Sequence, residues 1–222
     1  MNNLTLLIPA NKESESLPTF LNELSNYDYK KVVVLQKEDK ETINSISNFK
    51  DVELYIQKNK GYGSALSEGL ENIKTEFFCI INADGSMDPK YLDQMLKDCQ
   101  NQDFVFASRY MNNGGSDDDN FITFIGNKFF SLIGNLLYNL NLSDILYTYI
   151  LGRASAARKL DLKYHDFRIC VELPIKIKSK SLKYVSTGSM ERKRIGGKKK
   201  VNALKDGFLI LTAIISLFFK KL

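Results

Sequence analysis

Polar residues that can bind a cation follow a short apolar run near the middle of the chain. The stretch "CIINADGSMDP", residues 79–89, places Asn82, Asp84 and Asp88 in one short segment. A carboxylate beside a glycine in a loop can bind a hard cation such as Mg²⁺ or Mn²⁺ through oxygen, although the same letters are also common in turns. Asp88 precedes a proline, as N-caps often do, so we expect Asp88 to cap a helix and Asp84 to be the metal ligand.

Three other segments place polar or basic residues where apolar runs end. "LLIPANKE" contains Pro9 and Glu13 just after one run, and "FASRY" ends another run with Arg109. "KNKGYGSALSEGL", residues 58–70, is a basic loop with glycines that opens a helical pattern, which by itself is a weak indication of a phosphate site. The Arg109 guanidinium can bind a phosphate or form a surface salt bridge.

Short apolar runs alternate with helical patterns over the first half of the chain. The runs are rich in Val, Ile and Phe, as buried strands are: Leu4–Ile8, Val32–Leu35, Val52–Ile56, Phe77–Ile81 and Phe104–Ala107. This order predicts an α/β fold with a mostly parallel central sheet and helices on both faces, a Rossmann-like arrangement. Because ligands bind at the carboxyl ends of the strands in such sheets, the polar residues above are expected to meet at one edge.

The length and composition favour a single domain. The chain has 222 residues, of which 44% are hydrophobic, enough to bury one core. Its three cysteines, Cys79, Cys99 and Cys170, lack CxxC spacing, so we expect buried, reduced thiols and a reducing compartment. The first residues have no basic segment and only a short apolar run, unlike a cleavable signal. We therefore expect a cytoplasmic protein.

Basic residues concentrate toward the C-terminal end. From Lys178 onward there are 12 Lys and Arg against 2 Asp and Glu, a net +10, which leaves −5 for residues 1–177 out of the total of +5. Within this part, "GFLILTAIISLFF", residues 207–219, is uncharged but shorter than the roughly 20 residues that cross a bilayer. We expect a helix in the membrane interface; the alternative is a helix packed on the protein's own core. No nucleic-acid partner is expected, since aromatic residues do not alternate with the basic ones.

The series of motifs from Leu4 to about Leu211 resembles the family 2 glycosyltransferases with the A-type nucleotide-sugar-binding fold. In order, the motifs are "LLIPANKE", "NKGYGSALSEGL", "INADGSMDP", "FASRY", "IGNKF", "SD" and "RIGGKKKVNALKDG". Within that family the chain is most similar to the dolichyl- and polyprenyl-phosphate mannosyl- and glucosyltransferases. The resemblance implies inverting transfer of a hexose from a nucleotide-diphosphate sugar to polyprenyl phosphate, assisted by Mg²⁺ or Mn²⁺. With the C-terminal helix, it predicts peripheral association with the inner face of the membrane.

The resemblance implies donor-side roles for individual residues. Pro9 and Glu13 match positions that contact the nucleotide. Asn82 and Asp84 fall on the two acidic positions of the family's Asp-x-Asp motif, where Asp84 is the metal ligand. Ser86 falls where a polar contact to the metal or to a phosphate is often found.

Other implied roles lie on the acceptor side and on a basic loop. Arg109 matches an arginine that faces the acceptor or donor phosphate, and Asn127 with Lys128 matches a polar and basic pair beside the acceptor. Arg194 and Lys200 match basic residues of a loop that closes over the diphosphate. The expected catalytic set consists of Asp84, Arg109, Arg194 and Lys200.

Departures from the family pattern leave alternatives open. Asn82 replaces an acid beside the metal, and "VVVLQKEDKET" lacks the acidic stretch that reads the base. One alternative is a saccharide acceptor, a cell-surface glycan, whose hydroxyl needs a base such as Asp144 or Glu172. Another is a non-catalytic protein that binds nucleotide sugar or membrane. The sequence does not indicate which nucleotide or sugar is bound, or the oligomeric state.

The expected boundaries follow from these segments. Residues 1–200 form the nucleotide-sugar-binding domain, with its acceptor-side part at about 111–200, and residues 201–222 form the C-terminal interfacial helix. A further helix, Phe121–Leu140, is apolar over more than one face, so it contacts either a large core or lipid.

Overall fold

A seven-stranded, mostly parallel sheet forms the centre of the computed structural model, which describes residues 3–197 and 199–220. Its strands are β1 (Leu4–Pro9), β2 (Lys30–Leu35), β3 (Val52–Ile56), β4 (Phe77–Ile80), β5 (Phe104–Ser108), β7 (Ile150–Arg153) and β8 (Tyr184–Gly188). They lie in the order β3-β2-β1-β4-β7-β5-β8, and only β7 runs antiparallel to its neighbours. A second, two-stranded sheet pairs β6 (Gly115–Ser116) with β9 (Met190–Glu191).

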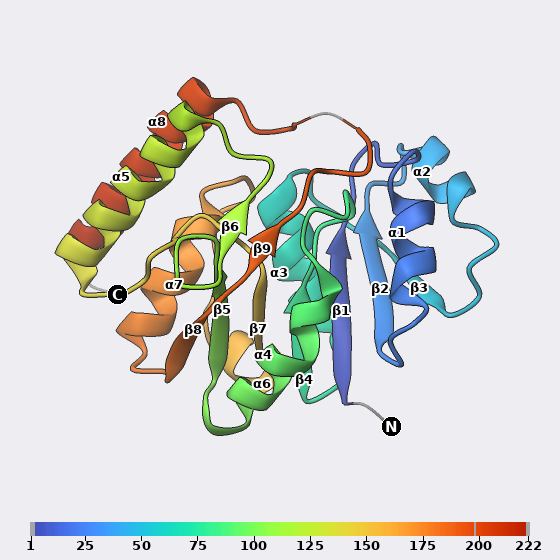
Figure 1. Ribbon diagram of the computed structural model, residues 1–222, viewed down its shortest axis with the longest axis horizontal. Helices are drawn as coiled ribbons and strands as arrows, with labels where there is room; N and C mark the ends of the chain where they lie inside the picture. The colour runs from blue at the N-terminus through green and yellow to red at the C-terminus, as the bar shows by residue number, and fades with distance from the viewer. Residues whose placement is uncertain (1–2, 198, 221–222) are drawn as a thin grey trace.

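Helices cover both faces of the central sheet, as Figure 1 shows. They are α1 (Leu17–Leu24), α2 (Lys40–Ser45), α3 (Tyr62–Asn72), α4 (Leu92–Asp98), α5 (Phe121–Tyr138), α6 (Ala154–Ala157), α7 (Ile169–Ser179) and α8 (Ala203–Phe219), with short 3₁₀ turns at Pro89–Tyr91 and Cys99–Asn101. One apolar core joins the sheet to α1 and α4, and the other joins it to α3, α7 and α8. The predicted fold class is therefore confirmed.

Side-chain alternation along the buried strands explains the two cores. On β1, Leu6 and Ile8 pack into the core with α1, whereas Leu7 packs into the core with α3. Since both faces of these strands are apolar, their sequences read as continuous apolar runs rather than as alternating ones. The five strands predicted from these runs are β1 to β5, with ends that differ by at most two residues.

The sequence did not reveal β7 and β8. β7 has only four residues and includes Gly152, where an added Cβ would lie 2.5 Å from the Phe104 ring. β8 reads "YVSTG" and is only partly buried at the edge of the sheet, so it lacks an apolar run. Both strands are held in place by β5, whose neighbours they are.

Helices α5 and α8 lie side by side and run in the same direction (Figure 1). Phe130 of α5 is 3.7 Å from the position that a Cβ on Gly207 would take, and Tyr138 contacts Phe218. α8 packs on the protein's own core through Ile210 and Ile214, which is the alternative stated above, while its other face is exposed. The location of α8 in a membrane interface stays a prediction. By length and composition α5 is also apolar enough to cross a membrane, and only 11% of it is buried.

The three cysteines are free thiols buried in the protein, as the sequence predicted. Burial raises the pKa of Cys79 and of Cys170, which keeps both thiols protonated and unreactive.

Candidate active site

The loop that follows β4 presents Asp84 at the carboxyl edge of the sheet. The backbone N–H and the hydroxyl of Ser86 both donate to Asp84 Oδ1, at 3.1 and 2.8 Å. Gly85 adopts a φ of +73°, and a Cβ there would lie 2.4 Å from the Ile195 side chain, so this turn needs glycine. Ser86 is 3% exposed and thus orients the Asp84 carboxylate from behind. Asp88 caps the following turn by accepting from Lys90 N–H, as predicted.

Asn82 is held by the first residue of α3. Its Oδ1 accepts a hydrogen bond from the Tyr62 hydroxyl at 3.1 Å, and that hydroxyl also shares a 2.6 Å hydrogen bond with Thr148. Burial raises the pKa of Tyr62, so the hydroxyl stays protonated. The ring of Tyr62 stacks on Phe167, with centroids 5.1 Å apart. Tyr62 is therefore a residue of the site that the sequence did not reveal.

The oxygens of Asp84 and Asn82 fit a hard divalent cation that takes further ligands from elsewhere. Ser86 occupies Asp84 Oδ1, whereas Oδ2 has only a long contact, 3.5 Å, to Arg194 Nη1. No cluster of three or more His, Cys, Asp or Glu suited to a metal exists among residues 3–197 and 199–220. Such a sparse set suits Mg²⁺ or Mn²⁺, which completes its shell with water and substrate phosphates.

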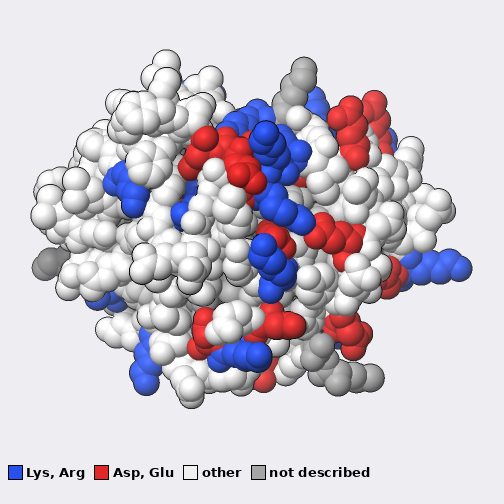
Figure 2. Space-filling model, viewed as in Figure 1, with Lys and Arg blue, Asp and Glu red and all other residues white. Residues whose placement is uncertain are grey.

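A basic loop, residues 192–197 with Lys199 and Lys200, lies over the ends of β1 and β4. Arg194 contacts Asp84 as described, and Lys200 Nζ is 3.0 Å from Glu13 Oε1. Glu13 is 7% exposed and also accepts from the Ser16 hydroxyl at 2.8 Å. The fold thus brings together four of the predicted donor-side residues, which lie far apart along the chain. In Figure 2, blue and red residues intermingle over the centre of this face.

Pro9 is buried at the end of β1, one residue before the backbone turns toward Glu13. The Ala10 N–H still donates to the Val34 carbonyl of β2, at 2.9 Å, so the chain leaves the carboxyl edge of the sheet directly after Ala10. Pro9 therefore lies beside the expected nucleotide position, where it shapes the backbone and contributes no polar group.

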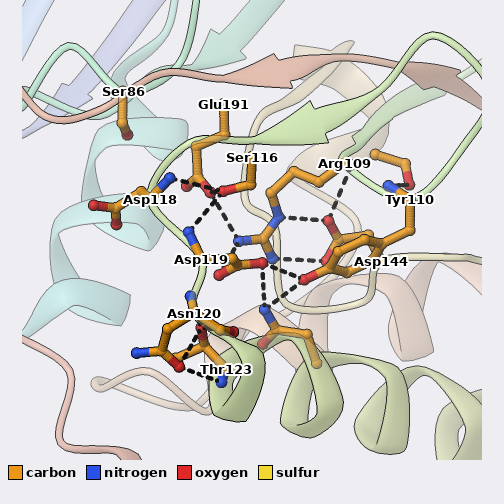
Figure 3. A network of polar contacts seen from close by, with 12 residues as sticks. Ser86, Arg109, Tyr110, Ser116, Asp118, Asp119, Asn120, Thr123, Asp144 and Glu191 are labelled. Carbon is orange, nitrogen blue, oxygen red and sulfur yellow. Dashed lines mark hydrogen bonds and ion pairs between the residues drawn. The ribbon is translucent and has the colours of Figure 1, made fainter.

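Arg109, at the end of β5, lies inside a network of carboxylates, which Figure 3 shows in detail. Its Nε and Nη2 donate to Asp144 at 2.7 and 2.9 Å, and Nη1 lies 3.1 Å from Glu191 and 3.5 Å from Asp119. The guanidinium also packs over the Tyr147 ring, 4.7 Å from its centroid. Burial alone would lower the pKa of Arg109, but Asp144 and Glu191 hold it well above the usual value.

These contacts correct the role expected for Arg109. Every guanidinium nitrogen donates to a carboxylate, and the residue is only 9% exposed. A buried arginine paired in this way supports the protein's own acids rather than an incoming phosphate. The sequence could not reveal this, because Asp144 and Glu191 lie 35 and 82 residues away.

Asp144 and Glu172 are not placed as catalytic bases. Asp144 is 2% exposed, and both of its oxygens accept from Arg109. Glu172 is fully buried and accepts from the backbone N–H groups of Lys163 and Tyr164, at 2.8 and 2.9 Å. It also pairs with Lys176 at 2.9 Å. Both carboxylates are therefore paired within the protein, so neither is placed to act as the base that a hydroxyl acceptor would need.

Asn127 and Lys128 lie beside the Arg109 network, and their expected place beside the acceptor stays a prediction. Asn127 Nδ2 donates to the Tyr110 hydroxyl at 2.8 Å, and that hydroxyl donates to Asp119 at 2.5 Å. Lys128 is exposed and lies 4.6 Å above the Tyr110 ring. Within the part of the chain that the structure describes, no acid lies within ion-pair distance of Lys128.

Glu191, on β9, is a carboxylate of this network that the sequence did not single out. Its Oε2 accepts from Ser116 Oγ at 2.5 Å and from Arg109 at 3.1 Å. Burial raises the pKa of Glu191, and Arg109 and Ser116 offset only part of the shift. Glu191 also forms an isolated antiparallel β-bridge with Met87 of the Asp84 loop, so Glu191 joins the donor and acceptor sides.

The raised pKa of Glu191 predicts a pH-dependent contribution to stability. Because the folded protein holds this proton more tightly than the unfolded chain, stability should fall as pH rises from the ordinary value of 4.5 through the raised pKa. Glu191→Gln cannot titrate, so in thermal melts from pH 4.5 to 7.5 the melting temperature of the variant should rise relative to that of the wild type as pH rises. Glu53→Gln, which changes an exposed carboxylate on β3, serves as the control. A melting-temperature difference that is constant with pH would contradict the expectation.

Comparisons with known proteins identify the family of the chain and relatives that share its fold. The model of the family described as Glycosyl transferase family 2 matches residues 5–161, which is more than half of the chain. Glucosyl-3-phosphoglycerate synthase from Mycobacterium tuberculosis, solved with Mn²⁺, UDP and glucosyl-3-phosphoglycerate, superposes with a TM-score of 0.74 at 11% identity, covering 96% of this chain and 78% of that one. Mannosyl-3-phosphoglycerate synthase from Rubrobacter xylanophilus gives a TM-score of 0.60 at 14% identity, covering 96% and 71%. At these identities the likeness shows a shared fold.

Proposed function

The chain belongs to glycosyl transferase family 2 and is a nucleotide-sugar glycosyltransferase, and from this premise we propose that it moves a hexose to polyprenyl phosphate at the cytosolic face of a membrane. The observation that carries the proposal is the exposed apolar surface of α5 and α8, which begins beside the Arg109 network. Such a surface is unusual on a protein whose substrates are all water-soluble.

On the donor side, the basic loop supplies positive charge to the diphosphate. Arg194 and Lys200 lie next to Asp84 and Glu13, where a nucleotide diphosphate would enter. When the bond from the sugar to the diphosphate breaks, negative charge grows on the leaving group, and these cations stabilise it. Asp84 with Asn82 would hold a Mg²⁺ or Mn²⁺ ion, which adds further positive charge when bound. The mycobacterial neighbour was solved with Mn²⁺ and UDP, which supports this assignment.

On the acceptor side, a lipid phosphate needs no catalytic base. It is anionic near neutral pH and can attack the sugar directly from the opposite side, which inverts the configuration. This agrees with the burial of Asp144 and Glu172 in structural ion pairs. Lys128 is an exposed cation that packs over the Tyr110 ring of this network, so we assign it to the lipid phosphate, with Asn127 bound to the Tyr110 hydroxyl.

The apolar surface of α5 and α8 is suited to the membrane interface. Its most exposed members include Phe121, Ile122, Leu136, Leu204 and Phe219, each more than three-quarters exposed. In Figure 2 the area over α5 and α8 is largely white, whereas charged residues gather over the centre of the molecule. Lys205 and Lys220 flank the apolar part of α8, as expected for a helix whose lysines reach lipid headgroups. If α5 lies in the interface with its exposed apolar face toward lipid, its polar residues Asn127 and Asn135 keep their hydrogen bonds to the rest of the protein.

Charged substitutions on this surface should weaken membrane binding. Leu136→Glu on α5 and Leu204→Glu on α8 should each lower partitioning onto phosphatidylethanolamine and phosphatidylglycerol vesicles by about tenfold, since burying a leucine contributes about 1.5 kcal/mol or more. Co-sedimentation measures the bound fraction. Leu54→Glu, at an exposed position of the edge strand β3, is the matched control and should bind like the wild type. Equal loss in all three variants would show a general charge effect and contradict the assigned surface.

The proposed activity is tested by the solubility of the product. The protein is incubated with labelled UDP- and GDP-hexoses, Mg²⁺ or Mn²⁺, and vesicles that contain polyprenyl phosphate, and the organic phase is counted. We expect label in the organic phase, and none when polyprenol without a phosphate replaces the acceptor. Label found only in water-soluble products would contradict the lipid acceptor.

A second candidate acceptor is a small phosphorylated hydroxy acid. The two synthases that share the fold are named for 3-phosphoglycerate products. A hydroxyl acceptor needs a base, and Glu191 differs from Asp144 and Glu172 because its contacts to Arg109 and Ser116 use Oε2 and leave Oε1 without a hydrogen bond among the described residues. Burial also raises the pKa of Glu191, which favours its role as a proton acceptor. Adding 3-phosphoglycerate to the same assay distinguishes the two candidates, because its product stays in water.

A further inference from the structure

We infer that Asp118 is a positioning residue that holds the basic loop closed over the donor carboxylates until a diphosphate replaces it. The inference rests on the proposed function, because it takes the nucleotide diphosphate as the ligand of the loop. Asp118 lies in the acidic segment "SDDDN", residues 116–120, between β6 and α5. That segment comes from the acceptor side of the site, whereas Asp84 and Glu13 come from the donor side.

Asp118 makes the ion pairs at the middle of the basic loop. Its Oδ2 lies 2.9 Å from Lys199 Nζ and 3.4 Å from Arg194 Nη2, and its backbone carbonyl accepts from Lys199 at 3.1 Å. The other terminal nitrogen of Arg194 faces Asp84 at 3.5 Å. One guanidinium is therefore shared between a donor-side and an acceptor-side carboxylate.

The position of Asp118 is fixed by its own segment. The backbone N–H groups of Asp118 and Asp119 both donate to Ser116 Oγ, at 3.2 and 3.0 Å, and Ser116 in turn donates to Glu191. Figure 3 shows Asp118 turned away from the Arg109 network, toward the side of Ser86. The Asp118 carboxylate thus faces the basic loop from a rigid base.

Two kinds of contact hold the basic loop, one at each end. At its start, Arg192 donates to the Gly85 carbonyl and pairs with Glu23 at 2.7 Å, and the Ile195 N–H donates to the Asp84 carbonyl at 2.8 Å. Past the two glycines that follow, the main contacts are ion pairs of Lys199 with Asp118 and of Lys200 with Glu13. The start is therefore anchored by hydrogen bonds to backbone carbonyls of the Asp84 loop as well as by an ion pair, whereas the far end depends on charge pairs that another anion can replace.

A diphosphate competes directly with these carboxylates. Arginine and lysine form stronger, charge-assisted hydrogen bonds to phosphate oxygens than to a partly exposed carboxylate that already shares them. Binding the diphosphate requires Arg194 and Lys199 to leave Asp118. Removal of the Asp118 charge should therefore loosen the empty loop and strengthen diphosphate binding.

The test compares Asp118→Asn with two matched variants. Asp117→Asn makes the same change at the preceding residue, whose side chain is exposed and forms no ion pair in the described residues. Asp118→Glu keeps the negative charge at position 118. Limited trypsin digestion of the ligand-free protein, read by mass spectrometry, measures cleavage between residues 192 and 200. Calorimetric titration with UDP and GDP, with chelator present, measures affinity without metal. Melting curves confirm that all the variants are folded.

We expect trypsin to cleave Asp118→Asn within the basic loop. Of UDP and GDP, the one that binds the wild type more tightly should bind Asp118→Asn about twofold to fivefold more strongly than it binds the wild type, the range that a partly exposed ion pair provides. Asp117→Asn should match the wild type, and Asp118→Glu should lie near it. High salt should remove the difference. Cleavage equal to that of Asp117→Asn, or weaker diphosphate binding, would overturn the inference.

The outcomes also separate this inference from the proposed function. Neither readout uses an acceptor, so a failure to form lipid-linked product leaves both expectations standing. If the wild type binds neither UDP nor GDP in the chelator titration, and still binds neither when Mn²⁺ replaces the chelator, the donor site and the role of Asp118 are both overturned.

Discussion

Replacing Asp84 with asparagine should lower the rate of sugar transfer by about a hundredfold or more. The substitution keeps an oxygen that can accept from Ser86 but removes the charge that would hold the metal diphosphate. Loss of about 3 kcal/mol of transition-state stabilisation corresponds to this factor, and metal-assisted charge stabilisation supplies several kcal/mol. Initial rates measured across a range of Mn²⁺ concentrations should show a higher metal requirement as well as a lower maximum.

The control for this prediction is Asp88→Asn in the same loop. Asparagine caps a helix about as well as aspartate, so the turn at Pro89 should persist while one negative charge is lost four residues from Asp84. Asp88→Asn should keep nearly full activity. Similar losses in both variants would mean that the loop needs overall negative charge and that Asp84 has no special role.

Arg109→Met should be the most destabilising substitution considered. It leaves Asp144, Glu191 and Asp119 buried without their shared cation, and breaking a buried ion pair in this way costs about 3–5 kcal/mol. Methionine retains much of the apolar stem, so lost packing is a minor part of the effect. For a chain of this size we expect the melting temperature to fall by roughly 10 °C or more, measured by calorimetry at neutral pH.

Arg168→Met provides the comparison for Arg109→Met. Arg168 pairs with Asp166 at 2.8 Å near the surface, where such pairs contribute about 1 kcal/mol or less. If Arg109→Met were as stable as Arg168→Met but had lost acceptor binding, Arg109 would be a phosphate ligand after all. The structural role derived from its contacts would then be wrong.

Sequence reasoning placed the expected donor-side residues at one edge of the sheet because the signals there are local. Apolar runs mark the buried strands, and polar residues directly after β1 and β4 must reach the carboxyl edge of the sheet. Asp84 and its cap neighbour Asp88 could be told apart from adjacent residues alone, since a proline follows only Asp88. The fold and the family follow from the same local patterns taken in order.

The acceptor side was harder to predict because its residues take their roles from distant partners. Arg109 follows a strand as a phosphate ligand would, yet its carboxylate partners come from the loop before β7 and from β9. Asp144 and Glu172 are carboxylates, as a base would be, but both are buried and each is paired with a cation of the protein. The partners Asp144 and Glu191 lie too far from Arg109 in sequence to leave a pattern, whereas Glu172 and Lys176 are an i,i+4 pair that the sequence does show.

The sequence by itself determined the layered fold, the position of Asp84 and the presence of a basic loop, because strand burial and turn chemistry depend on neighbouring residues. Only the tertiary structure decided what the charges do. It encloses Arg109 with three acids, shares Arg194 between Asp84 and Asp118, and leaves one face of α5 and α8 without a protein partner. The reason is that ion pairing and burial depend on distances in space, and ion pairs join residues as far apart in the chain as Glu13 and Lys200.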